Sequence, residues 1–286
     1  MRGSGICRKF VEFSRMDILK IIVEYCSLDF DQVVDHAKFS QYAIVHHSTS
    51  IEGSTLTAIE TQLLLDEGVT PAGKPLLHSL MTKDHYDALR YVVKTADSRM
   101  PVNTELVQEI NARVMKNTGN VYETVLGRID ASKGEFRKGN VQAGNTYFVN
   151  YDKVVPYTNA LMEKLREQMP GATDTMEQLD ISFSAHFDLV TIHPFYDGNG
   201  RTSRLLMNYI QQYYHLPLAI VHIEDKAAYY EALQQTRKQE NSEIFRDFMY
   251  RQYDKHLRTE IDEYNKAVHA QQIQPKTGGK GFSLFL

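Results

Sequence analysis

The spacing of apolar residues along the chain predicts a mostly helical protein. Over most of the 286 residues, apolar positions recur three and four residues apart, as they do on one face of a helix. The clearest segments are 76–96 (LLHSLMTKDHYDALRYVVKTA), 175–192 (TMEQLDISFSAHFDLVTI) and 242–270. The strongly apolar segment 175–192 is expected at the centre of the core. It should end at His193, because Pro194 disfavours helical backbone in the residue before it.

Capping residues place several helix ends. Thr55 or Thr57 is a candidate N-cap; Thr57 followed by Glu60 has the spacing of a capping box, and Gly68 is expected to stop that helix. Asn103 or Thr104 is expected to start the helix NTELVQEINARVMK, and a further helix is expected after Pro156. These signals extend the helical prediction through most of the chain.

Residues 118–150 break the helical pattern. They are rich in Gly and Asn and contain short β-prone runs, and NVQAGNTYFV (140–149) is typical of two extended pieces around an Ala-Gly-Asn turn. The predicted fold class is therefore all-α with one small β-hairpin inserted.

Composition narrows the function classes. The net charge of −4 argues against a chain built for bulk nucleic-acid binding, since such chains are usually basic. Cys7 and Cys26 form no CxxC or Cys/His cluster, and two lone cysteines suit a reducing cytoplasm. No apolar run is long enough to span a membrane, and the first ten residues lack the apolar core of a signal peptide. We expect a cytoplasmic protein.

The chemistry concentrates in TIHPFYDGNGRTSRLLMNY, residues 191–209. Gly198 and Gly200 allow a loop whose backbone N–H groups point in one direction, and the helix beginning near Arg201 adds its positive N-terminal end. Arg201 and Arg204 lie on one helix face, where two guanidinium groups can clamp phosphate oxygens. This arrangement favours a di- or triphosphate ligand.

Two further residues complete a reaction site. Asp197 precedes the glycine loop, and a carboxylate beside phosphates is a natural ligand for Mg²⁺. His193 is the group of the loop whose pKa is ordinarily near neutral, which suits a general base. The set predicts phosphoryl or nucleotidyl transfer to a hydroxyl group that His193 deprotonates.

At this point HPFYDGNGRTSR resembles the signature of Fic-domain proteins, HPFx(D/E)GNGRxxR, with every fixed position filled. The resemblance extends over roughly residues 40–250. It implies transfer of AMP from ATP to a Ser, Thr or Tyr hydroxyl of a target protein, with His193 as the base, Asp197 on Mg²⁺, and a structural role for Phe195. It also implies that Gly198, Asn199, Gly200, Arg201 and Arg204 hold the phosphates.

The resemblance implies two further parts of the site. One is a flap that covers it and pairs with the backbone of the target, here Val141, Gln142, Ala143, Gly144, Asn145, Thr146 and Tyr147. The other is a place for the nucleotide base, near Tyr229 and Tyr230.

A second motif lies far upstream. Ser48, Glu52 and Gly53 have the spacing SxxxEG, which alone is no more than a helix end with a glycine stop. Beside a complete Fic signature it resembles the inhibitory motif (S/T)xxxE(G/N). It implies that Glu52 pairs with Arg204 and displaces the γ-phosphate, so that the protein is autoinhibited.

The expected organisation has three parts. Residues 1–100 form an N-terminal helical region with an inhibitory helix around 44–53, residues 101–250 the Fic core, and residues 251–286 a C-terminal helix and tail. The tail is interpreted as a loose end rather than a docking segment. A homodimer is compatible with this organisation.

Some residues have a plainer interpretation than their chemistry suggests. His186 is expected to be packed or hydrogen-bonded rather than a metal ligand, and His46 and His47 are interpreted as surface or helix-packing residues. Most tyrosines are interpreted as core residues, although self-modification on one of them is an open alternative. Three alternatives remain for the site: removal of AMP with Glu52 positioning water, transfer of another phosphate-containing group, and a regulatory module with a vestigial nucleotide site.

Overall fold

The computed structural model describes residues 15–32, 35–144 and 146–273. The expectations for Asn145 and for the tail after residue 273 lie outside these residues. Within them the helices are α1 (Arg15–Ser27), α2 (His36–Ile51), α3 (Ala58–Glu67), α4 (Leu76–Asp97), α5 (Thr104–Val114), α6 (Tyr151–Gln168), α7 (Thr175–Ile192), α8 (Asn199–Tyr213), α9 (Lys226–Gln239) and α10 (Ser242–Ile273). Single 3-10 turns are η1 (Phe30–Gln32), η2 (Ala131–Lys133), η3 (Met169–Gly171) and η4 (Ile223–Asp225).

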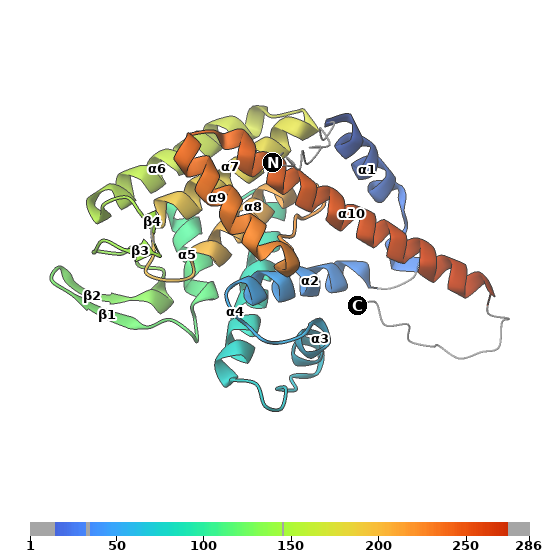
Figure 1. Cartoon of the computed structure of the whole chain (residues 1–286), viewed down its shortest axis with the longest axis horizontal. Helices are drawn as coiled ribbons and strands as arrows, with labels where there is room; N and C mark the ends of the chain where they lie inside the picture. Colours follow the sequence, from blue (N-terminus) through green and yellow to red (C-terminus); the bar gives the residue numbers. More distant parts are fainter. Residues whose placement is uncertain (1–14, 33–34, 145, 274–286) are drawn as a thin grey trace, which may run out of the picture.

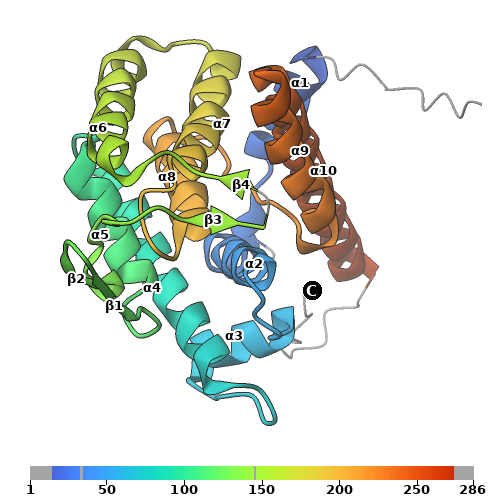
Figure 2. The ribbon, with the colours of Figure 1, turned by 60° about the vertical axis from the view of Figure 1, so that its left-hand side comes forward.

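Helix α8 lies at the centre of the fold. It packs along α7 and α4 and also contacts α5 and α2. Figure 2 shows α5 and α6 on one side of it and α9 and α10 on the other. Every residue of α8 from Arg201 to Gln211 is buried, although its first turn is polar. Because buried polar groups cost free energy unless they are hydrogen-bonded, the polar first turn of α8 needs partners inside the fold.

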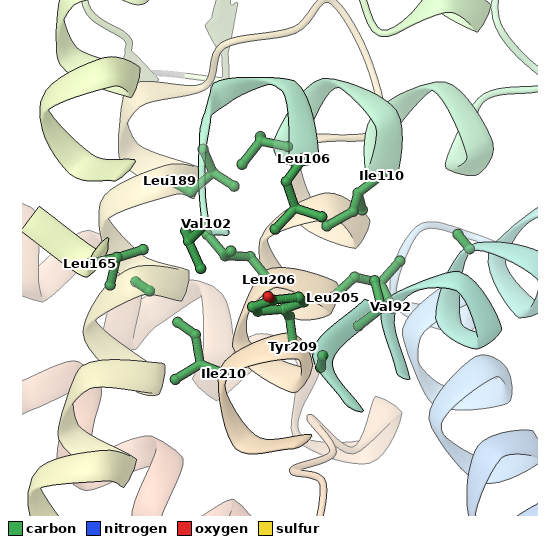
Figure 3. Close-up of a cluster of buried hydrophobic side chains, with 14 of the residues drawn as sticks. Val92, Val102, Leu106, Ile110, Leu165, Leu189, Leu205, Leu206, Tyr209 and Ile210 are labelled. Carbon is green, nitrogen blue, oxygen red and sulfur yellow. The ribbon is translucent and has the colours of Figure 1, made fainter. Parts of the chain in front are cut away.

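Two apolar clusters hold α8 in place. The larger joins α4, α5, α7 and α8, and Figure 3 shows Val92, Leu106, Leu189, Leu206 and Ile210 pointing toward one another within it. The second lies under α1, α9 and α10, with Phe183, Phe245 and Tyr253 at its centre. The site therefore rests on a helix fixed from two sides.

The predicted all-α class is confirmed, with differences in detail. Thr57 and Glu60 form the expected capping box, Asn103 caps α5, and α7 ends at Ile192. The sequence predicted one hairpin, and the structure has a second. Strands β1 (Val121–Thr124) and β2 (Gly127–Asp130) form it, with Val121 opposite Asp130. Its turn contains Val125 and Leu126 in place of the Asn-Gly pair that signals a hairpin.

Two helix starts differ from the expectation. Helix α6 begins at Tyr151 rather than after Pro156, which lies inside it. The proline is tolerated near the start because Asp152, whose carbonyl loses its usual helical donor, is exposed to solvent. The helix expected around residues 44–53 begins earlier, at His36, where the Asp35 side chain accepts from the Lys38 N–H. Among the described residues, no helix combines the length and apolar character needed to cross a bilayer.

Candidate active site

The 193–200 loop connects the two central helices through two unusual backbone positions. His193 ends α7 with φ of 53°, a left-handed conformation that is uncommon for a residue other than glycine. Gly198 begins α8 with φ of 77°, and a Cβ there would collide with Asn111 and Met115. Both turns aim the start of α8 back toward the end of α7.

Asn199 closes this loop on itself. Its side chain accepts from the Phe195 N–H and donates to the Phe195 carbonyl, both at 2.9 Å. The Phe195 ring is buried against Phe136, as expected for a structural residue. Both ends of the amide are thus used to hold the loop, and the backbone N–H of Asn199 lies at the start of α8.

Asn111 on α5 braces the same loop, a role that the sequence did not indicate. Its side-chain amide donates to the Asp197 carbonyl and to the Thr202 hydroxyl, both at 3.1 Å. It is fully buried. The loop is thus pre-organised from within by Asn199 and from below by Asn111.

His193 is neutral and oriented. Its Nδ1 lies 3.4 Å from the Val190 carbonyl, which can only accept, so Nδ1 carries the proton and Nε2 keeps its lone pair. Burial lowers the pKa of His193 to about 4, and the positive charges of Arg137 and Arg237 act in the same direction. The imidazole is therefore in its basic form at neutral pH.

Arg204 is buried and held by helix α2. Its Nε donates to the Ser48 hydroxyl at 2.8 Å, and its Nη2 donates to the Ser48 carbonyl at 3.0 Å and to Glu52 Oε1 at 2.7 Å. Nη1 has no partner among the described residues. Glu52 and Arg204, which lie 152 positions apart in the sequence, thus form a direct ion pair.

Glu52 also fills the space at the start of α8. Its Oε1 lies so close to Gly200 that a Cβ on Gly200 would collide with it. Burial raises the pKa of Glu52, but the charges of Arg204 and Arg201 and the hydrogen bond from Arg204 outweigh it, so the net pKa lies below its usual value. A carboxylate therefore occupies the helix N-terminus, where an anion is favoured.

A cavity of about 530 Å³ opens beside these residues. This volume lies in the range of small-molecule sites. Its lining includes Glu52, Ala143, Thr146, Phe148, His193, Gly200, Arg204, Tyr229, Tyr230 and Arg237. The structure thus brings residues of the motif, the flap, the upstream helix and α9 to one cavity.

Other predicted residues lie outside this lining. Arg201 is buried with Nη1 near the Val114 carbonyl and Nη2 near Met115 Sδ, and its Nε has no partner in the part of the chain that the structure describes. Asp197 is about half exposed, and its Oδ1 accepts from the Gly198 N–H at 2.6 Å. Gly53 ends the segment of Glu52 with φ of 101° and does not contact the cavity.

Tyr229 reaches the cavity from a buried position. Its hydroxyl lies 2.9 Å from His186 Nε2, and both side chains are almost fully buried. The expectation that His186 is packed and hydrogen-bonded is confirmed. Tyr230 is more open, with 45% of its surface exposed, so of the two it presents more ring surface to a ligand.

The predicted flap lies over His193. Strands β3 (Gln142–Ala143) and β4 (Thr146–Tyr147) pair antiparallel, with Gln142 opposite Tyr147. After the hairpin, the Phe148 ring stacks on the His193 imidazole at 3.7 Å between centroids and 13° between planes. Phe148 covers the proposed base, and no local signal in the sequence marks it.

Arg137 ties the flap to the motif loop. Its guanidinium donates to the carbonyls of His193 at 2.8 Å, Gly139 at 2.8 Å and Val149 at 2.5 Å. Its side chain is 2% exposed. A single buried cation thus satisfies three backbone acceptors on both ends of the flap and on the end of α7.

Replacing Arg137 with Met should lower the free energy of unfolding by about 3 kcal/mol, because three buried carbonyls lose a charged donor. Urea unfolding followed by circular dichroism measures this loss. Arg128→Met is the matched control, since Arg128 is exposed on β2 and should change stability by less than about 0.5 kcal/mol. Equal stability of the two variants would contradict the bracing role.

Comparisons with known proteins agree on one family. Residues 101–211 match the model of the Fic/DOC family. The protein adenylyltransferase Fic of Nematostella vectensis is 32% identical over 218 residues, which cover 73% of this chain and 45% of that protein. The protein of the same name from Drosophila melanogaster is 30% identical over 199 residues, 68% of this chain and 37% of that protein. The chain thus spans less than half the length of these relatives.

Solved structures share the fold. A Fic-domain signaling protein from Bacteroides thetaiotaomicron has a TM-score of 0.74 at 20% identity and covers 88% of this chain and 97% of its own. Residues 134–508 of Fic-1 from C. elegans have a TM-score of 0.70 at 24% identity and cover 90% and 72%. The signature at residues 193–204 lies inside the matched segment. The chain therefore contains a domain of the Fic/DOC family.

Proposed function

We propose that this protein transfers AMP from ATP to a hydroxyl side chain of a target protein, and that Glu52 restrains this activity. The observation that supports it best is the convergence of a neutral His193, the start of α8 and Arg204 on one cavity. The names of the relatives with which the chain shares about 30% identity support the same activity.

In the proposed reaction, His193, the start of α8 and Arg204 each have a separate role. His193 Nε2 accepts the proton of the target hydroxyl, and the hydroxyl oxygen forms a bond to the α-phosphorus. The bond from that phosphorus to the bridging oxygen of the β-phosphate breaks, and pyrophosphate leaves. The N–H groups at the start of α8 and the Arg204 guanidinium are placed to bind the charge of the leaving phosphates.

Asp197 fits a role as the residue that would hold Mg²⁺. Its carboxylate is about half exposed and stands directly before the anion-binding end of α8. Mg²⁺ prefers carboxylate and phosphate oxygens, and it would neutralise phosphate charge there. Arg201, buried beneath Asp197 with Nη2 3.9 Å away, would position this carboxylate and add positive charge.

The flap supplies the surface for a target. The short strands β3 and β4 are exposed, and Tyr147 keeps 80% of its surface open. An extended segment of a target can pair with such an edge and bring its hydroxyl toward His193. Phe148 covers one face of the imidazole, and a hydroxyl can approach Nε2 in the plane of the ring.

Removal of AMP is the second candidate. The Glu52 carboxylate lines the same cavity as His193, so it could position a water molecule against a phosphodiester bond. In that case Glu52 would be required rather than inhibitory.

One experiment separates the candidates. Wild type and Glu52→Gly are incubated with ATP labelled at the α- or the γ-phosphate and with cell lysate, and modified peptides are identified by mass spectrometry. AMP transfer leaves the α-label on protein and adds an adenylyl group to the modified peptide, whereas the γ-label leaves as pyrophosphate. Gain of α-label in Glu52→Gly supports transfer, and loss of AMP release from a modified protein supports removal.

The pH dependence of the activated variant tests the base. Because the pKa of His193 is about 4, its basic form dominates throughout the neutral range. The kcat/KM of Glu52→Gly, measured with saturating Mg²⁺, should be flat from about pH 8 to pH 6 and fall only as pH approaches about 4. The negative charge of Glu52 raises the pKa of His193, so its loss lowers that pKa and shifts the fall in kcat/KM to a lower pH. An acid limb near 6.5, the ordinary value for His, would contradict the assignment.

A further inference from the structure

A second polar cluster lies at helix α2, beginning with His47, the residue before the Ser48 that binds Arg204. His47 from α2 and His222 and Glu224 from the segment after α8 place one ligand atom each within 4.8 Å of one another. The two imidazole rings are 4.8 Å apart at an angle of 63°. We propose that these three residues form a binding site for a transition-metal cation of the Zn²⁺ class, which joins α2 to the core.

The donor atoms have the chemistry of such a site. Two imidazoles and one carboxylate, with a fourth position open to water, is a set that Zn²⁺ accepts. Within the described part of the chain, the Nε2 of His222 has no hydrogen-bond partner, although His222 is only 8% exposed. In the tautomer protonated on Nδ1, this nitrogen has a lone pair free for a cation.

The spacing needs only a small closure. Ligand atoms about 2.0–2.2 Å from a tetrahedral Zn²⁺ lie about 3.3 Å from one another. Glu224 is exposed, so rotation of its side chain can bring its carboxylate to the imidazoles. His47 Nδ1 accepts from the Ile223 N–H at 3.2 Å, and coordination through Nδ1 would replace this long hydrogen bond.

The surroundings favour a cation. The three residues line a cavity of about 420 Å³, which provides an entry path, and Glu260 and Glu263 also line it. Glu260 is already engaged by His36 Nε2 at 2.8 Å, and of the carboxylates lining this cavity Glu224 is the one that groups with both imidazoles. Lys255 also lines the cavity, but its ammonium is paired with Asp225 at 2.7 Å.

The ligands are held by rigid elements. The His222 N–H donates to Gln252 Oε1 at 2.9 Å, and Gln252 Nε2 donates to Asp225 Oδ2 at 2.9 Å. The η4 turn is thereby fixed to α10.

The position of the site gives it a regulatory consequence. His47 immediately precedes Ser48, which binds Arg204, and lies on the helix that ends beside Glu52. A metal that joins His47 to the segment after α8 therefore stabilises α2 in the place where Glu52 pairs with Arg204. This regulatory consequence rests on the proposed function, whereas the binding site does not.

Binding is tested on the full chain after treatment with a chelator. Calorimetric titration with ZnCl₂ should give one ion per chain, and Co²⁺ should give the visible absorption of a tetrahedral site. Glu224→Gln and His47→Gln should each weaken Zn²⁺ binding by at least ~10-fold. His269→Gln, an exposed histidine on α10, should leave it unchanged. Saturating Zn²⁺ should also raise Tm by about 5 °C in wild type and less in Glu224→Gln.

Absence of stoichiometric binding in wild type, or equal affinity in Glu224→Gln, would overturn the site. For the regulatory step, Zn²⁺ should lower AMP transfer by wild type and leave Glu224→Gln and Glu52→Gly unaffected. If Zn²⁺ binds but does not alter transfer by wild type, the coupling to α2 is overturned. If Glu52→Gly shows no transfer at all, the proposed function fails, and the calorimetric result still decides the metal site.

Discussion

Replacing Glu52 with glycine should raise the rate of AMP transfer by about 100-fold. In the structure the Nε and Nη2 of Arg204 donate hydrogen bonds to Ser48 and Glu52, and Glu52 Oε1 fills the space beside Gly200. ATP that binds against this carboxylate must place its phosphates elsewhere, and a displacement of about 1 Å can cost about 100-fold in rate. Glycine removes both the charge and the bulk.

A second substitution at position 52 separates the effect of charge from the effect of bulk. Glu52→Gln keeps the bulk beside Gly200 and loses the charge, so it should activate less than Glu52→Gly. Initial rates with α-labelled ATP at matched Mg²⁺ measure the series. Glu67→Gly is a suitable control, since Glu67 is an exposed glutamate at the end of α3. A Glu52→Gly protein no faster than wild type would sink the inhibitory role.

Activation should also cost stability. Arg204 is buried, and without Glu52 its guanidinium keeps the two hydrogen bonds to Ser48 but loses its anionic partner. Breaking a largely buried ion pair from one side is destabilising, by about 2 kcal/mol where, as here, one partner is partly open to solvent. ATP should recover this loss, because its phosphates offer Arg204 a new anion. A restraint that is both stabilising and inhibitory couples the stability of α2 to the activity of the site.

The sequence predicted where the helices lie more accurately than the residues at which they begin. Periodicity identified α4, α7 and α10, and capping chemistry fixed the starts of α3 and α5. The starts of α2 and α6 were missed because a cap by Asp35 and a proline in an exposed turn are weak local signals. Tertiary packing of the following turns decides where such helices begin.

The residues of the site divide in the same way. Motif spacing singled out His193, Gly200 and Arg204, and the structure places all three on one cavity. The approach of Glu52 to Arg204 followed only from a family resemblance, because no local pattern predicts a contact across 152 residues. Asn111, Arg137 and Phe148 were not found at all.

Those three residues share a physical reason for being missed. Each acts through backbone or ring contacts that exist only in the folded chain, such as the three carbonyls bound by Arg137. The sequence alone does not show whether an arginine in the flap is exposed or buried. Composition and spacing identify groups that react, whereas the groups that orient them are defined by the fold.

Replacing His193 should abolish most of the transfer that Glu52→Gly releases. A positioned general base contributes about 10²–10⁴-fold, so the double variants Glu52→Gly/His193→Ala and Glu52→Gly/His193→Asn should lose activity on that scale. ATP affinity should change little, because His193 contacts Val190 and Phe148 rather than Arg204. Initial rates and calorimetric ATP titration separate the two quantities.

The choice of asparagine answers a structural objection. His193 caps α7 in a left-handed conformation, so alanine there adds backbone strain as well as removing the imidazole. Asparagine tolerates that conformation better and has no basic nitrogen. If the loss were caused by strain, the asparagine variant would keep a large part of the activity. Equal loss in both variants, with urea midpoints close to that of Glu52→Gly, would leave removal of the base as the cause, and full activity in either would exclude His193 from that role.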